Sequence, residues 1–254
     1  MKNKNKPQII FVIMIALIIT GAAILMIAAL TDSGDGNTAV PGEIGDGNTP
    51  DIFDANDVIS REDPIIMTAD GLPVKFSEFN YFYHEISYSI IDNLDYPDDS
   101  TDEQKINIIK NALNNGVEEG RSFEDTAFER TKEYCVKFSF YKRDYISLGY
   151  EINKSYEIFY KTNDESIKAE SMEELQELNK RLLYTYGIVR NEYVDIKILT
   201  EFVNEYIELL GKTAKLEEYN ASIEKKVTKG EINVIIDADV AAEIKIPELL
   251  EQYK

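Results

Sequence analysis

The sequence predicts a mainly α-helical fold with a small β element, joined by a linker to one N-terminal transmembrane helix. Three observations lead to this class: an uncharged apolar run near the N-terminus, a spacer rich in Gly, Asp, Pro and Asn after it, and amphipathic segments with capping residues beyond. We divide the chain into a cytoplasmic tail over residues 1–7, a membrane anchor over 8–30, a flexible linker over 31–60 and a helical extracytoplasmic domain over 61–254.

The apolar run from Gln8 to Leu30 holds 23 residues without a charge. At about 1.5 Å per helical residue it covers a hydrocarbon layer of about 30 Å. A cleavable signal peptide is the main alternative, but its apolar region is usually about 7 to 15 residues long. Three lysines are the only charged side chains before Asp32, so the positive-inside bias places the N-terminus in the cytoplasm. We expect a single-pass cell-membrane protein with its bulk outside.

The spacer after the anchor contains GDGNT twice, at Gly34–Thr38 and at Gly45–Thr49. A calcium-binding loop with glycine at its sixth position needs a glutamate at its twelfth. The two registers place Gly42 and Phe53 there instead. We therefore interpret the repeat as a flexible spacer, and we expect no metal and no cofactor.

The predicted extracytoplasmic part is strongly acidic. The chain has 27 basic and 47 acidic residues, and three of the basic ones precede the anchor, which leaves a formal net charge of −23 beyond it. Such a surface repels phosphate backbones, so nucleic acid is not an expected partner. The negative field favours basic or nascent exported segments and discourages self-association, although a homo-oligomer stays open.

The chain has one cysteine, Cys135, so no intrachain disulfide can form. A bacterial lipoprotein would need a cysteine just after the apolar run, which excludes that kind of lipid anchor. Cys135 shares a helical face with Thr131 and Phe138, and this favours a buried structural thiol over a nucleophile.

Two extended segments far apart in the sequence form the expected β element. Pro64–Asp70, the turn GLP and Val74–Phe76 predict a short hairpin. The β-rich run Glu231–Asp237 lies about 165 residues later and needs a partner. We predict that it pairs with Ile65–Thr68 and ties the two ends of the domain together.

Apolar residues at three- and four-residue spacing, with capping residues at the ends, predict the helices of the domain. The first helix is capped by Ser77, and its buried face holds Phe79, Phe82, Tyr83, Ile86 and Ile90. The second runs from Thr101 to Asn114–Gly116 with Ile106, Ile109 and Leu113 facing inward. The third is capped by Ser122 and ends at Gly149. The fourth helix restarts at Asn153 and runs through Tyr156 and Phe159. The fifth begins at a Ser171–Glu174 capping box, has Leu175, Leu178 and Leu182 in register, and ends at Gly187. The sixth covers Glu192–Leu210, and the seventh runs through Leu216, Tyr219 and Ile223. The segment Glu192–Leu210 has two apolar stripes, so we expect that helix to be central.

The order of these pieces resembles the SurA and PrsA group of extracytoplasmic foldases. The residues that carry the resemblance are Gly71 with Val74–Phe79, then LGYEI at Leu148–Ile152, and YGIVRNEYVDIKILTEF at Tyr186–Phe202. It covers about Pro64 to Tyr219. In that group a helical N-terminal chaperone domain precedes a parvulin-type peptidyl-prolyl isomerase domain. The resemblance therefore implies a role in protein folding and secretion.

The chain departs from that group where catalysis would lie. Only 35 residues follow Tyr219, which is too short for a parvulin domain, and the paired histidines typical of its site have no counterpart because His84 is the sole histidine. His84 faces away from the main apolar stripe, so we expect it on the surface. We assign no catalytic residues and favour a protein that is not an enzyme.

The predicted function is a membrane-anchored chaperone that binds unfolded or exported polypeptides without catalysis. Such proteins need apolar, adaptable surface, and rings in a groove provide it. The client-binding candidates are Tyr81, Tyr88, Phe82 and Phe202, and of these Tyr81 and Tyr88 are turned from the core stripe and expected to be exposed. Two alternatives stay open: an envelope scaffold or assembly subunit that holds one specific partner, and an active prolyl isomerase.

Overall fold

The computed structural model of the chain describes residues 62–149, 172–213 and 215–254. The predicted tail, membrane anchor and linker lie outside these ranges, as does the helix predicted to restart at Asn153. Within the ranges, no helix is both long enough and apolar enough to span a bilayer.

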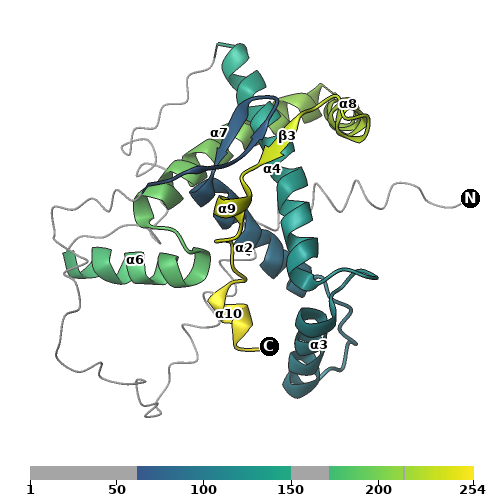
Figure 1. The fold of residues 1–254 in the computed structure, drawn as a ribbon, viewed down its shortest axis with the longest axis vertical. Helices are drawn as coiled ribbons and strands as arrows, with labels where there is room; N and C mark the ends of the chain where they lie inside the picture. The colour runs from purple at the N-terminus through teal and green to yellow at the C-terminus, as the bar shows by residue number, and fades with distance from the viewer. Residues whose placement is uncertain (1–61, 150–171, 214) are drawn as a thin grey trace, which may run out of the picture.

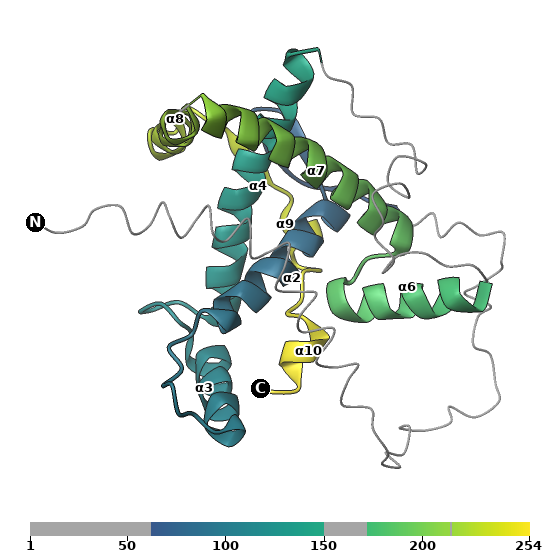
Figure 2. The same cartoon turned by 180° about the vertical axis from the view of Figure 1, so that it is seen from behind.

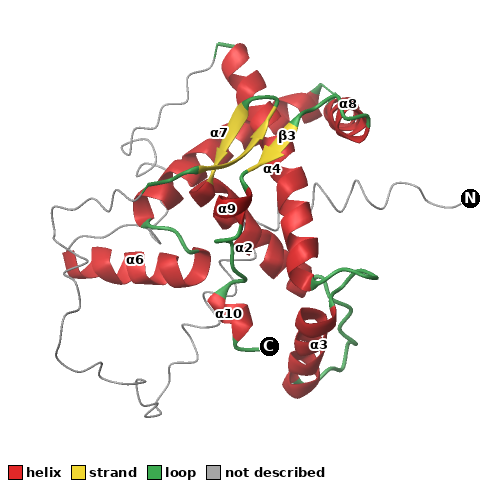
Figure 3. Ribbon diagram, viewed as in Figure 1, coloured by secondary structure: helices red, strands yellow, loops and turns green. Residues whose placement is uncertain are grey.

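Helices make up most of the described part, with one small sheet (Figures 1 and 3). The elements in chain order are β1 (Ile65–Ala69), β2 (Leu72–Lys75), α2 (Phe76–Asp92), α3 (Asp102–Asn115), α4 (Phe123–Ser147), α6 (Met172–Tyr186), α7 (Arg190–Lys212), α8 (Leu216–Thr228), β3 (Val234–Ile236), α9 (Ala238–Ala241) and α10 (Glu248–Glu251). The predicted class, mainly helical with a small β element, is confirmed for these residues.

The sheet confirms the predicted pairing of the two ends of the domain. Its order is β2-β1-β3 with antiparallel neighbours, and Thr68 of β1 stands opposite Ile235 of β3. The hairpin turns at Asp70 and Gly71, which both have positive φ, as two-residue hairpin turns of type I′ require. Asp70 also binds the incoming strand, since its N–H donates to the Asn233 carbonyl over 2.9 Å and its carboxylate accepts from the Asn233 N–H over 2.8 Å.

Helix α2 starts directly at the end of β2, and the prediction that Ser77 caps it is wrong. Ser77 lies inside the first turn. Its N–H and its hydroxyl both donate to the carboxylate of Asp63, over 2.8 and 2.7 Å. The cap therefore comes from a residue 14 positions earlier, which local spacing rules do not detect.

Helix α2 is the most deeply buried helix of the described part. Of its 17 residues 13 are buried, because α4 packs on one side and α6 and α7 on others. Figure 2 shows α2 crossing the middle of the molecule among these helices. Helix α7 contacts α4, α2, α6 and α8, and both of its predicted stripes are largely covered. Leu199 and Val203 of the first stripe and Val194 and Ile198 of the second are buried, and Leu209 at the end of the second is exposed.

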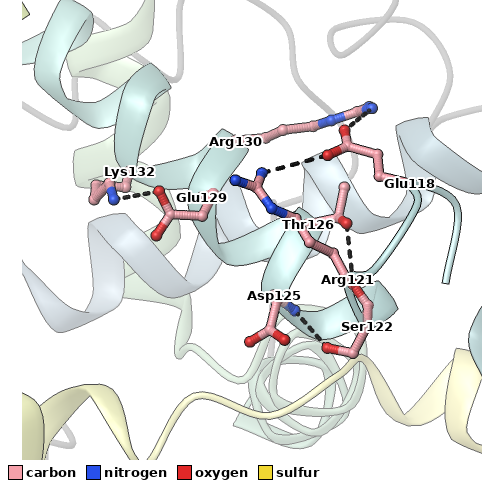
Figure 4. Close-up of polar contacts among 8 residues, drawn as sticks. All are labelled: Glu118, Arg121, Ser122, Asp125, Thr126, Glu129, Arg130 and Lys132. Carbon is pink, nitrogen blue, oxygen red and sulfur yellow. Dashed lines mark hydrogen bonds and ion pairs between the residues drawn. The ribbon is translucent and has the colours of Figure 1, made fainter. Parts of the chain in front are cut away.

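Helix α4 begins where the sequence predicts. The Ser122 hydroxyl accepts from the Asp125 N–H over 3.0 Å, and the Thr126 hydroxyl donates to the Ser122 carbonyl over 3.0 Å (Figure 4). Glu118, just before the helix, forms ion pairs with Arg121 and with Arg130, which lies two turns into α4. These contacts fix the connection that leads from α3 into α4.

Helix α3 lies at the periphery and packs mainly against α4. The capping box is formed by Thr101 and Gln104, so the predicted start is confirmed. Leu113 is buried as predicted, but Ile106, which we expected to face inward, is exposed. A helix that packs mainly against one neighbour has too little covering surface to bury its whole apolar stripe.

Candidate functional site

The structure places the predicted client-binding rings in or against the core. Tyr81 and Phe82 are only 3% and 1% exposed, so the expectation that Tyr81 is exposed is wrong. Tyr88 and Phe202 are half-buried and pack against the core. The reason is that α6 and α7 cover a second face of α2, which would be exposed to water if only the face with the apolar stripe were packed.

The buried rings join four helices. Tyr81 of α2 lies 5.0 Å from the Tyr186 ring of α6 and 5.7 Å from the Tyr193 ring of α7, centroid to centroid. On another side of α2, the Phe82 ring lies 4.7 and 5.0 Å from the rings of Tyr134 and Phe138 in α4. Tilted and edge contacts at these distances are typical of stabilising core pairs.

A row of polar side chains on α2 binds the last carbonyls of α6. Asn80, His84 and Tyr88 are spaced four residues apart and so lie on one side of the helix. The Asn80 amide donates to the Tyr186 carbonyl over 2.7 Å, and the Tyr88 hydroxyl donates to the Thr185 carbonyl over 3.0 Å. These carbonyls have no partner within their own helix, and the row from α2 satisfies them.

His84 is buried in this row, so its predicted surface position is wrong. Its Nδ1 lies 2.6 Å from the Thr185 carbonyl oxygen, and the ring makes another hydrogen bond with the backbone of Lys245. Burial lowers the pKa of His84 to about 4, although both backbone bonds oppose that shift. A neutral ring therefore links α2 to α6 and to the C-terminal segment.

Glu85, the next residue, is buried beside the tyrosines. Burial raises the pKa of its carboxyl to about 7, while a hydrogen bond with Tyr186 and the charge of Lys197 pull the pKa down. One carboxyl oxygen, Oε1, lacks a hydrogen-bond partner in the described residues. Spacing in the sequence could have identified a polar side of α2, formed by Asn80, His84, Glu85 and Tyr88. Spacing alone does not tell which helix packs against that side.

Cys135 is buried in α4, as predicted, and burial raises the pKa of its thiol well above the ordinary value. A thiol held protonated in this way is a poor nucleophile. In the described ranges no cluster of His, Cys, Asp and Glu side chains is arranged to hold a metal ion. The interior of the described part consists of packed aliphatic and aromatic side chains, with hydrogen bonds between helices.

The exposed apolar side chains lie elsewhere, at positions that were not among the predicted client-binding residues. Ile146 and Leu148, at the end of α4, are 50% and 55% exposed. Leu183 and Tyr184 are exposed on α6, and Ile235 on β3 is 57% exposed. Apolar residues at helix ends and strand edges look like core residues in a sequence, because periodicity does not record where a neighbour stops.

No protein-family model, no curated protein and no solved structure matches this chain. The similarity to the SurA and PrsA foldases therefore stays a prediction that rests on the residues quoted above.

Proposed function

We propose that the chain is a membrane-anchored extracytoplasmic chaperone that holds unfolded or exported polypeptides by non-covalent contacts. The proposal takes its class from the resemblance to the foldase group. The groups that bind the client are the exposed aliphatic side chains of the described domain, and not the predicted aromatic rings, which are buried or half-buried.

The observation that carries the proposal is the end of α4. Ile146 and Leu148 both stand about half exposed within one helical turn, on a chain whose formal net charge is −20. The two side chains are two positions apart and so point to different sides of the helix end, where each offers a client one apolar contact. Small aliphatic contacts bind many sequences weakly, which suits a chaperone of unfolded chains.

The acidic surface gives the contact site a second property. A negative field raises the encounter rate with basic segments and keeps copies of the chaperone apart. We therefore expect client binding to weaken as salt concentration rises, since ions screen surface charges over about 10 Å at 0.1 M.

The test is an aggregation assay with the full-length chain in lipid nanodiscs and three unrelated proteins that aggregate after dilution from denaturant. We expect light scattering to fall for all three. The double variant Ile146→Ser/Leu148→Ser should lose most of this effect, and the matched variant Ile106→Ser/Val227→Ser, at other exposed positions, should keep it.

Each other outcome identifies a different function. Protection of a single client would indicate a dedicated envelope scaffold, and protection of none would contradict the proposal. Turnover of a proline-containing peptide by the same preparation would indicate an isomerase. We expect none, because the only histidine is buried and its Nδ1 lies against the Thr185 carbonyl oxygen.

A further inference from the structure

The two outer edges of the small sheet are built differently. In an antiparallel ladder alternate residues direct their backbone groups to the same neighbour. The Asp70 N–H donates to the Asn233 carbonyl and the Asp237 N–H to the Ile66 carbonyl, both over 2.9 Å. The even-numbered residues of β1 therefore face β3, and Met67 and Ala69 face β2.

The β2 edge is protected against pairing with another chain. Val74 and Leu72 stand opposite Met67 and Ala69, so the alternate residues of β2, Pro73 and Lys75, direct their backbone outward. Proline has no N–H to donate, and a charged lysine is costly to cover. Both are devices by which proteins keep a sheet edge from adding a strand.

The β3 edge has neither device. Ile235 pairs with Thr68, so Val234 and Ile236 direct their N–H and C=O groups away from β1, and within the described residues those groups make no hydrogen bond to another element. The strand sequence VII contains no proline and no charge. The strand is only three residues long, but its unpaired backbone groups are still a template for an added strand.

Both ends of β3 are held in place before any partner arrives. Asn233 is tied to Asp70 by two hydrogen bonds, and the Asp237 carboxylate accepts from the N–H groups of Asp239 and Val240 at the start of α9. A strand already held in its extended form loses little conformational freedom on pairing.

We propose that the β3 edge adds an extended segment of a client polypeptide as a fourth strand. The segment hydrogen-bonds to the backbone of Val234 and Ile236 and sets an apolar side chain against Ile235. This inference rests on the proposed chaperone function and names the mode of binding. Pairing through the backbone depends little on the side chains of the added strand, so it suits a protein that binds many clients.

Charge decides between a client segment and a second copy of this chain. Two copies would bring like net charges of −20 together, and Asp237 and Asp239 follow the strand directly. A segment with β-branched residues between lysines or arginines carries a charge opposite to the net charge of the chain and to Asp237 and Asp239. We therefore assign the edge to basic, apolar, extended segments.

The experiment measures fluorescence anisotropy of a labelled peptide with alternating valine and threonine between terminal lysines, titrated with the full-length chain in nanodiscs. A second peptide carries N-methyl groups on two adjacent central residues, which blocks both of its backbone edges and keeps its side chains. We expect the methylated peptide to bind about tenfold more weakly or worse, because it loses backbone hydrogen bonds. Equal binding of the two peptides would overturn the proposal.

A protein variant tests the same edge from the other side. Val234→Pro removes one outward N–H and leaves the Ile235–Thr68 pair, so peptide affinity should fall about three- to tenfold. Lys75→Pro is the matched control, because Lys75 lies on the opposite edge with φ −79°, which proline accepts. Equal losses in both variants would overturn the assignment to β3.

The aggregation assay separates failure of this inference from failure of the proposed function. If the unaltered chain protects clients and Val234→Pro protects them equally well, the chaperone function stands and the β3 edge is not its site. If the unaltered chain protects no client, the function itself fails. A change of molecular mass by light scattering in Val234→Pro, with peptide binding unaltered, would instead assign the edge to pairing between two copies.

Discussion

Helices α2 and α3 begin from similar sequence patterns and end in opposite environments. Each has an apolar stripe at helical spacing and a cap at its N-terminus. In the structure 13 of the 17 residues of α2 are buried, and only Ala112 and Leu113 of the 14 in α3. The difference comes from the number of neighbours, since α2 is covered by α4, α6 and α7 and α3 chiefly by α4.

This difference shows that periodicity predicts which side of a helix faces the core, but not how many neighbouring helices cover its other sides. Tyr81 and His84 lie off the main stripe of α2 and are buried, whereas Ile106 lies on the stripe of α3 and is exposed. Stability should therefore depend far more on α2 than on α3, and four pairs of substitutions test how α2 is held.

The largest effect is expected for Phe82→Ala in α2. The ring is fully buried between the Tyr134 and Phe138 rings, so removing it leaves a cavity and should cost about 3–5 kcal/mol of unfolding free energy. The matched change Ile106→Ala in α3 should cost less than about 0.5 kcal/mol, because the side chain is already exposed. Urea denaturation followed by circular dichroism measures both, and similar costs would contradict the comparison.

The second test uses the pH dependence of α2. Glu85 has a pKa of about 7 in the folded state, above its ordinary 4.5, so between these pH values the folded state holds a proton that the unfolded state has lost. The contribution of Glu85 to the unfolding free energy therefore falls as pH rises from 4.5 to 7. His84 has a pKa of about 4, below its ordinary 6.5, so stability from His84 rises as pH rises from 4 to 6.5. The two contributions oppose one another over the shared range.

Removing either group should therefore reveal the other. Going from pH 4.5 to pH 8, Glu85→Gln should gain up to about 3 kcal/mol of unfolding free energy relative to the unaltered chain, and His84→Asn should change in the opposite direction. Denaturant titrations at four pH values measure both slopes. Parallel curves for the two variants would show that one of these groups is not buried as described.

The third test concerns the glycine against which α2 packs. Gly187 has φ +63°, and a Cβ there would lie 2.5 Å from the Asn80 amide nitrogen of α2. Gly187→Ala should cost about 2 kcal/mol or more, from backbone strain together with displacement of Asn80. Gly149→Ala is the control, because Gly149 also has positive φ but open space around its Cβ position, so only the strain of about 1 kcal/mol applies.

The smallest effects are expected at the caps. Asp63→Ala removes the acceptor for the first turn of α2 and should lower the unfolding free energy of the whole domain by about 1 kcal/mol. Thr101→Ala removes the cap of α3 and should chiefly fray that peripheral helix. Amide hydrogen exchange distinguishes the two, since the first change should speed exchange throughout the core and the second only within α3.

Most predictions that depended on nearby residues were confirmed, with the cap at Ser77 as the exception. The caps at Thr101 and Ser122, the glycine at the end of α6 and the burial of Cys135 follow from rules that act over a few residues. Pairing of β1 with β3 was also correct, because an isolated β-rich run needs a partner and the chain offered few others.

The wrong predictions share a different cause. The cap on α2 comes from Asp63, the burial of His84 from the end of α6 and the C-terminal segment, and the exposure of Ile106 from a missing neighbour. Each depends on where another element comes to lie. No local pattern in the sequence records that position.

The sequence by itself determined the class of the fold, the ends of most helices and the pairing of the two ends of the domain, because backbone hydrogen bonding and apolar periodicity act over short distances. Only the tertiary structure decided which rings are core, that His84 is a buried link and that one sheet edge is left open. These depend on how many surfaces each element meets, and that number is set when the helices pack together.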